Sequence, residues 1–106
     1  MRFLDNVLSD YIARAPDEMA RAKYSAERER SVGLGVMGFH SFLQARNLSF
    51  EGAMAKSWNL KIFKHIRAQV DQASMMLAKE RGPCPDAADM PPYRGLAVTW
   101  ILYRYA

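Results

Sequence analysis

The chain has 106 residues, a length that fits one small domain. With 50% hydrophobic and 25% charged residues, it has the composition of an ordinary soluble globular protein. The net charge of +4 does not indicate a nucleic-acid partner, because basic and acidic residues are interleaved. The longest apolar run, residues 96–103, is too short to span a bilayer, and residues 1–6 lack the apolar core of a secretion signal. A single cysteine, Cys84, excludes an internal disulfide and favours a reducing compartment, so we expect a cytoplasmic protein.

The first element is predicted to be an amphipathic helix over about residues 3–15. Apolar side chains recur every four residues in two adjacent rows that form one stripe: Phe3, Val7 and Tyr11, and Leu4, Leu8 and Ile12. The opposite face is polar: Asp5, Asn6, Ser9 and Asp10. Pro16 ends the helix, because it disfavours helical geometry at the residue before it. Residues 18–28 are polar and carry only a thin apolar stripe, which favours a solvated helix or an ordered loop over a core element.

Residues 31–37 are the best strand candidate, because branched apolar residues alternate there with serine and glycine. Gly38 allows a sharp turn into a helix over about residues 39–46. Asn47 is expected to stop this helix in a left-handed conformation.

Gly33, Gly35 and Gly38 form the pattern G-x-G-x-x-G, which also occurs in dinucleotide-binding sites. Such a site needs a buried strand before the pattern, a crossover helix after it and an acidic residue about twenty residues further on. Here the preceding residues 28–30 are charged, and Gly52-Ala53-Met54 stands where the acid belongs. We therefore interpret the glycines as points of close backbone packing in a strand, and not as a nucleotide site.

A long helix is predicted over about residues 50–81, with Ser49 as its N-cap. Its apolar stripe consists of residues four apart, joined by three more on the same side: Trp58, Ile62, Ile66 and Val70, with Phe63, Ala73 and Leu77. Such a helix spans ~45 Å, which is long for a domain of this mass, so a break near residues 57–59 is an alternative. Gly82 and Pro83 end it. The basic residues among 56–67 are interpreted as a solvated face.

The last segment, residues 91–106, begins with two prolines and is rich in aromatic residues. Its apolar run 96–103 fits either a strand or a short buried helix, and the periodicity does not distinguish them.

The residues that could carry chemistry are few. His40 lies in an apolar helix and is interpreted as a hydrogen-bonded structural histidine, whereas His65 is expected on the surface. Cys84 has no histidine nearby in the sequence and is interpreted as structural, and Met75 and Met76 as core fillers. Neither metal-ligand spacing nor a nucleophile with its base is present. We therefore assign no catalytic, cofactor-binding or metal-binding residue, and we expect no cofactor.

The stretch Arg30-Ser31-Val32-Gly33-Leu34-Gly35-Val36-Met37-Gly38 resembles the large (alpha) subunit of ribonucleotide reductase. Residues 3–8 look like the helix that precedes this stretch in the family. Residues 77–85, Leu-Ala-Lys-Glu-Arg-Gly-Pro-Cys-Pro, look like its Ala-Lys-Glu-x-Gly-x-Cys-Pro passage. The resemblance covers roughly residues 2–89, and its separate features occur in the order of the family.

This resemblance implies a fragment of an enzyme that reduces ribonucleotides to deoxyribonucleotides for DNA synthesis, by radical chemistry in a ten-stranded α/β barrel. The fragment would be mainly α, with helices about 3–15, 39–46 and 50–81 and one short strand about 31–37. In the family, the catalytic cysteines and the nucleotide-regulatory sites lie outside the segment seen here, and Cys84 matches a position that is not catalytic. We therefore expect the chain to be inactive alone.

The resemblance also divides the chain into a barrel fragment, residues 1–89, and a divergent aromatic tail, residues 90–106. We hypothesise that the tail is a frameshifted, truncated or split-gene end. The expected partners are the remainder of the large subunit or the small subunit. A strand taken from a barrel has unpaired edges, so self-association is also expected. The alternative is a small helical interaction protein, derived from the reductase, that binds a protein partner through the tail.

Overall fold

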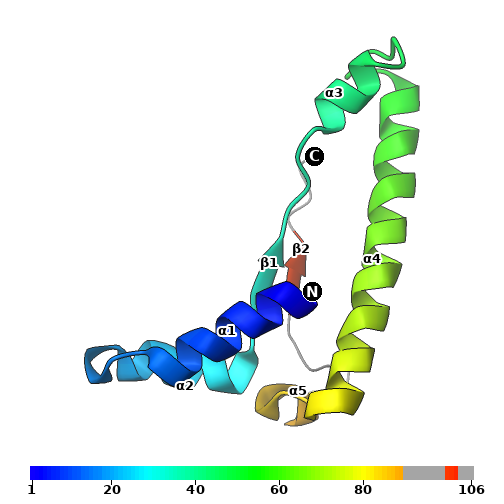
Figure 1. Cartoon of the computed structure of the whole chain (residues 1–106). Helices are drawn as coiled ribbons and strands as arrows, with labels where there is room; N and C mark the ends of the chain where they lie inside the picture. The colour runs from blue at the N-terminus through cyan, green and yellow to red at the C-terminus, as the bar shows by residue number, and fades with distance from the viewer. Residues whose placement is uncertain (90–99, 103–106) are drawn as a thin grey trace.

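The computed structural model of the chain describes residues 1–89 and 100–102 (Figure 1). Its elements, in chain order, are α1 (Arg2–Arg14), a short 3-10 turn η1 (Asp17–Met19), α2 (Ala20–Glu29), β1 (Val32–Leu34), α3 (Phe39–Gln44), α4 (Ala53–Arg81), α5 (Pro85–Asp89) and β2 (Trp100–Leu102). The expected mainly α class is confirmed. Residues 18–28, for which a helix or a loop was expected, lie in η1 and α2, and α2 has no buried residue.

The two strands form a parallel pair, in which Val32 lies opposite Trp100 and Leu34 lies opposite Leu102. Parallel strands need a long crossover connection, and α3 and α4 lie between them in the sequence. β1 is shorter than the expected 31–37, because its ladder with β2 has only three residue pairs. β2 lies within the apolar run 96–103, so the strand alternative holds for its residues.

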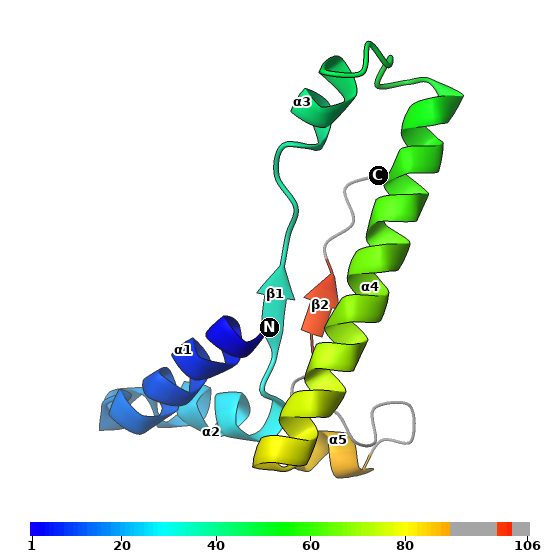
Figure 2. The same cartoon turned by 45° about the vertical axis from the view of Figure 1, so that its right-hand side comes forward.

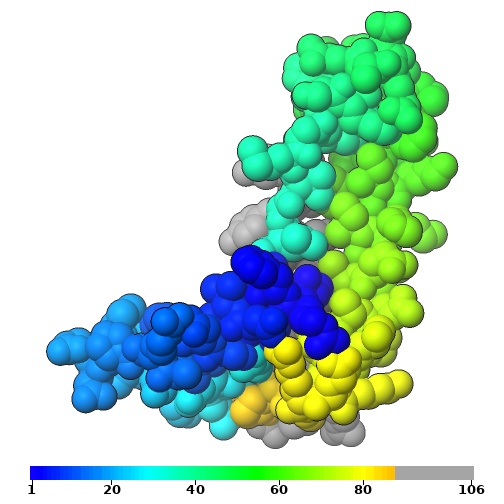
Figure 3. Space-filling view, in the orientation of Figure 1, coloured from blue at the N-terminus to red at the C-terminus, as the bar shows by residue number. Residues whose placement is uncertain are grey.

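The chain is shaped like the letter L (Figure 3). α4 stands alongside the strand pair as the upright, and α1 and α2 project sideways near the lower end of α4 (Figures 1 and 2). The radius of gyration is 17.0 Å, whereas a compact domain of this length has about 13 Å. The elements therefore do not close around one central core.

The described residues form only a small core. The buried apolar residues among them are Leu43, Ala55, Val70, Leu77, Cys84 and Ala87. Leu77 of α4 is 1% exposed and packs against Met1 and Val32, so it joins α4 to β1 and to the start of α1. The expected stripe of α1 is only partly buried, because Phe3 and Val7 are 75% and 51% exposed.

α4 begins at Ala53, three residues later than expected. Ser49 is not its cap: the N-cap is Gly52, whose N–H donates to the carbonyl of Ser49 at 3.1 Å in the preceding turn. The helix continues through residues 57–59 without a break and ends at Gly82, whose φ is +88°. None of the described helices is long and apolar enough to cross a membrane.

The predicted apolar stripe of α4 is confirmed by buried Val70 and Leu77 and by half-buried Trp58. Met75 and Met76, however, are 49% and 52% exposed, so the prediction of core fillers is wrong. They come just before Leu77, and the helical period turns them away from the face that meets β1.

The residues predicted to bound the short helices do so. Ala15, before Pro16, has an extended backbone with ψ of 130°, and α1 ends there. Gly38 and Asn47 have φ of +81° and +51°, the left-handed geometry expected on either side of α3. Leu43 is the buried residue of this helix.

Candidate functional site

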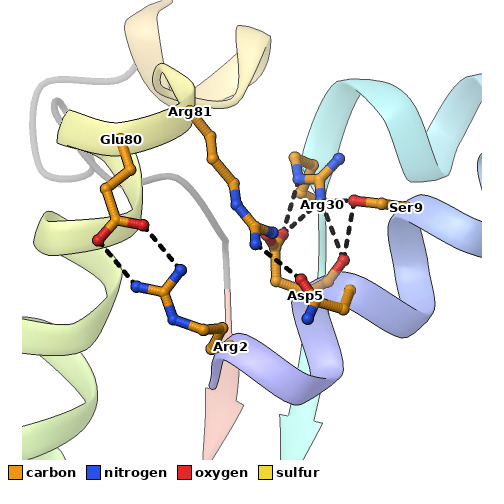
Figure 4. Close-up of polar contacts among 7 residues, drawn as sticks. Arg2, Asp5, Ser9, Arg30, Glu80 and Arg81 are labelled. Atoms are coloured by element: carbon orange, nitrogen blue, oxygen red, sulfur yellow. Dashed lines mark hydrogen bonds and ion pairs between the residues drawn. The ribbon is translucent and has the colours of Figure 1, made fainter.

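The strongest polar cluster surrounds Asp5, whose side chain is 1% exposed (Figure 4). Its Oδ1 accepts hydrogen bonds from Nε of Arg30, at 3.0 Å, and from Nη2 of the same guanidinium. Its Oδ2 accepts a hydrogen bond from Nη1 of Arg81. Nη2 of Arg30 also donates to Oγ of Ser9 at 2.7 Å and to the backbone carbonyl of Asp5 at 3.2 Å. We call Asp5, Ser9, Arg30 and Arg81 the Asp5 cluster.

The Asp5 cluster connects three helices at their ends. Asp5 lies in the first turn of α1, Arg30 caps the C-terminus of α2, and Arg81 is the last residue of α4. Arg30 has a φ of +46°, a left-handed geometry that a residue with a Cβ adopts at a cost. Its hydrogen bonds to a buried carboxylate offset that cost, since charge-assisted hydrogen bonds are the stronger kind.

Further ion pairs surround the cluster. Arg2 donates two hydrogen bonds to Glu80, at 2.7 and 2.8 Å, which is the bidentate geometry that suits arginine and carboxylate. These hydrogen bonds raise the pKa of Arg2 and lower the pKa of Glu80. Arg28 of α2 pairs with Asp86 of α5 at 2.5 Å. The cluster therefore holds the sideways helices at a defined angle to α4.

The sequence analysis did not find this cluster, because Asp5 belongs to the predicted polar face of its helix. Its partners stand 25 and 76 residues away, and no local spacing reveals them. The one available signal was Arg30, the first residue of the stretch that carries the family resemblance. Both carboxylate oxygens of Asp5 are occupied by guanidinium groups, so the arrangement is suited to structure and not to proton transfer.

The glycine pattern does not form a phosphate cradle. Gly33 lies in β1, and Gly38 is the N-cap of α3, a helix of only six residues. The prediction of close packing is wrong at Gly35, because a Cβ added there would have no heavy atom of the described structure within 4 Å. Gly38 is required for another reason, its positive φ.

The other candidate residues lie apart from one another. His40 is exposed, with its ring centroid 5.8 Å from that of Phe50, so the prediction of a structural histidine is wrong. His65 is exposed, as predicted. Cys84 is 1% exposed and lines a cavity of about 280 Å³ beside the Asp5 cluster. Within residues 1–89 and 100–102, no group of three histidine, cysteine or carboxylate side chains could hold a metal ion.

A larger cavity lies between α3 and the first turns of α4, and we call it the α3–α4 groove. It has a volume of about 540 Å³ and is mainly apolar; its lining residues are Val36, Phe39, His40, Phe50, Glu51, Ala55, Lys56 and Asn59. Asn59 has a buried Oδ1 that accepts no hydrogen bond from the described part of the chain. The groove is therefore a mainly apolar cavity, and one of its lining residues has a buried polar atom without a hydrogen-bond partner in the described part of the chain.

An aromatic cluster holds α3 against α4. The ring of Phe42 meets the edge of Trp58 at a centroid distance of 5.2 Å. The guanidinium of Arg46 lies 4.0 Å from the centroid of Phe42, and the ammonium of Lys61 lies 5.1 Å from that of Trp58. Such cation–π contacts stabilise exposed aromatic rings. Lys61, expected on a solvated face, thus lies over an aromatic ring of its own helix.

Comparisons with known proteins give one consistent result. The family model described as ribonucleotide reductase, barrel domain, matches residues 1–103. The ribonucleoside-diphosphate reductase large subunit of Invertebrate iridescent virus 6 is 46% identical over 87 residues, which are 82% of this chain and 9% of that protein. The large subunit of Invertebrate iridescent virus 3 is 42% identical over 84 residues, which are 79% of this chain and 13% of that protein.

A solved structure is also similar, that of the Actinobacillus ureae class Id ribonucleotide reductase alpha subunit. It has a TM-score of 0.83 and 36% sequence identity, and the match covers 91% of this chain and 18% of that chain. The chain thus spans less than a fifth of each of these three proteins.

The family match includes residues 90–103, which the sequence analysis set apart as a divergent tail. The division at residue 89 stays a prediction. The match over nearly the whole sequence and the shared fold agree with the resemblance first seen around the glycines. The chain therefore belongs to the ribonucleotide reductase barrel-domain family, and its helices and paired strands are a fragment of that barrel domain.

Proposed function

We propose that the chain serves as a structural segment of a ribonucleoside-diphosphate reductase large subunit and contributes one β–α–β unit to its barrel. The observation that carries this proposal is the parallel pairing of β1 with β2 across α4, in a fold that superposes on a reductase alpha subunit. A parallel pair leaves one free edge on each strand, which further strands of a barrel would occupy.

The segment supports the reaction without performing it. Radical reduction of ribonucleotides, as the family resemblance implies, needs at least three cysteines, whereas this chain has one, which is buried. The Asp5 cluster would set the angle between the sideways helices and α4, and thereby the direction in which β1 enters the barrel. The partner is then the remainder of the large subunit, with the small subunit acting on the assembled enzyme, in the cytoplasm.

The test is fragment complementation. The probe is the large subunit of Invertebrate iridescent virus 6 from which the matched segment has been deleted, called here the complementary polypeptide. We expect the chain and the complementary polypeptide to elute together in gel filtration, and each alone to lack ribonucleoside-diphosphate reduction. Failure to form any complex would contradict the proposed function.

A second candidate is a small interaction protein that binds an intact reductase or another copy of itself. It is favoured by the many exposed large apolar side chains: Phe3, Tyr24, Met37, Phe50, Met54 and Leu60, among others. Sedimentation of the free chain at tens of micromolar tests whether it binds another copy of itself. We expect self-association, and a clean monomer would contradict it. A pull-down of intact reductase with and without residues 91–106 tests the role of the tail.

Nucleotide binding through the glycine pattern is the third candidate, and the geometry of Gly35 and Gly38 gives it no support. Titration of the chain with ATP and dATP should show no saturable binding at millimolar concentrations. Saturable binding that is lost on Gly38→Ala would restore the nucleotide interpretation.

A further inference from the structure

The stretch that follows β1 keeps the alternation of a strand, although no strand pairs with it among the described residues. Val32, Leu34 and Val36 all lie on the side of α4, because each one packs against that helix or lines a cavity together with its residues. A period of two is that of an extended strand. The chain also continues from β1 toward α3 in the same direction (Figure 1). Strand geometry therefore extends past Leu34, where β1 ends.

The other side of this stretch is bare. Gly33 and Gly35 alternate with the residues that face α4, and a Cβ added at Gly35 would have no heavy atom of the described structure within 4 Å. Met37, the next residue on the same side, is 97% exposed. Glycine weakens a strand because it has no side chain to pack, and an aromatic side chain on the neighbouring strand compensates by covering it. The bare side thus has room for aromatic side chains from a neighbouring strand.

The ladder between β1 and β2 indicates which segment that neighbour is. Its pairs advance by one residue on each strand, and the last described pair is Leu34 with Leu102. Residues 103–105 follow directly in the sequence and lie outside the described residues. The same register sets Tyr103 opposite Gly35. Directly paired residues share a face of the sheet, so this tyrosine belongs to the bare side.

Pairing with residues of the same chain costs less than pairing with another molecule. The three described pairs already close the connection between β1 and β2, so each further pair orders only the residues that form it. A separate polypeptide or a second copy also loses translational and rotational freedom. Tyrosine is in addition one of the residues that strands favour. Residues 103–105 are therefore the favoured neighbour of residues 35–37.

From these observations we infer that residues 103–105 extend the parallel ladder along residues 35–37, with the ring of Tyr103 over Gly35 and that of Tyr105 beside Met37. The aromatic residues of this segment then complete the strand pair of the chain itself. Both segments belong to this chain, so the inference does not rest on the proposed function.

An engineered disulfide tests the register. Under mild oxidation at low micromolar concentration, the pair Met37→Cys and Tyr105→Cys should form an intrachain disulfide at least tenfold faster than the pair Met37→Cys and Arg104→Cys. Position 105 shares a face with position 37 at about 5 Å, whereas a side chain at position 104 points to the opposite face. Cys84, which is 1% exposed, is present in both variants. Equal rates, or disulfides between two chains, would overturn the inference.

Hydrogen exchange followed by NMR tests the backbone pairing. The N–H groups of successive strand residues point to opposite edges, so at least one of Gly35 and Val36 donates to the added segment. Its exchange should be at least tenfold slower in the full chain than in a chain that stops at Leu102. Val70, which is buried in α4, is the control, because its protection should not change on truncation. Equal exchange at residues 35 and 36 in the two forms would refute the pairing, and the disulfide test does not need the shortened form to fold.

A strand from the rest of the large subunit is the alternative neighbour. In that case exchange at residues 35 and 36 slows only when the complementary polypeptide is added, which would overturn the inference and support the proposed function. Slow exchange in the full chain alone supports the inference, whether or not a complex with the complementary polypeptide forms.

Discussion

Replacement of Asp5 by asparagine should be the most damaging single-atom change in the chain. The carboxylate accepts hydrogen bonds from two arginines, whose side chains are 21% and 37% exposed, while Asp5 itself is 1% exposed. Removing one member of a buried ion pair costs about 3–5 kcal/mol. The partial exposure of Arg30 and Arg81 lets water solvate them, so we expect a value near the lower end, about 3 kcal/mol.

Urea unfolding followed by far-UV circular dichroism measures this loss. With a slope of about 1.5 kcal/mol per M for a small protein, the midpoint should fall by about 2 M. Asp10→Asn is the matched control, because Asp10 lies on the same helix, is 55% exposed and pairs with Arg14 one turn away. Surface pairs of that kind contribute little. Equal midpoints for the two variants would refute the argument that the Asp5 cluster holds the three helices together.

Four further variants test other parts of the structure. The hydrogen bonds from Arg2 lower the pKa of Glu80 below its ordinary value of 4.5, so the contribution of this pair to stability is present above pH 4.5 and is lost as the pH falls through the folded-state pKa. The stability difference between the wild type and Glu80→Gln should therefore vanish in acid, and a constant difference would contradict this. Gly38→Ala should destabilise the chain by about 1 kcal/mol because of its positive φ, whereas Gly35→Ala should change it by less than about 0.5 kcal/mol. Leu77→Ala should cost about 2–4 kcal/mol in the same urea assay, since Leu77 is 1% exposed; a cost below that of a surface substitution would show that the core lies elsewhere.

The elements that could be predicted from the sequence are those specified by neighbouring residues. The apolar residues four apart in α4 select a helix, Gly82 ends it, and Asn47 ends the turn after α3. The strand at residues 32–34 could be predicted because apolar residues alternate there with small ones at a period of two. In each case the deciding interaction lies within a few residues of the signal.

The features that could not be predicted depend on distant partners. The burial of Asp5 follows from Arg30 and Arg81, which reach it from two other helices. The exposure of Met75 and Phe3 follows from the lack of packed neighbours among the described residues, and hydrophobicity alone cannot reveal that. The groove beside Asn59 arises only when α3 folds back onto α4, where the contact of Phe42 with Trp58 fixes its position.

The parallel pairing of β1 with β2 also orders the events of folding. Val32 pairs with Trp100, so α3, α4 and α5 must all be synthesised before the ladder can form. Closing so long a loop is entropically unfavourable and slow. α4 reduces the cost, because a helix forms from local contacts and brings the two strand segments toward each other as a rigid spacer. We therefore expect α4 to form early and the strand pair to close last, as the rate-limiting step in refolding.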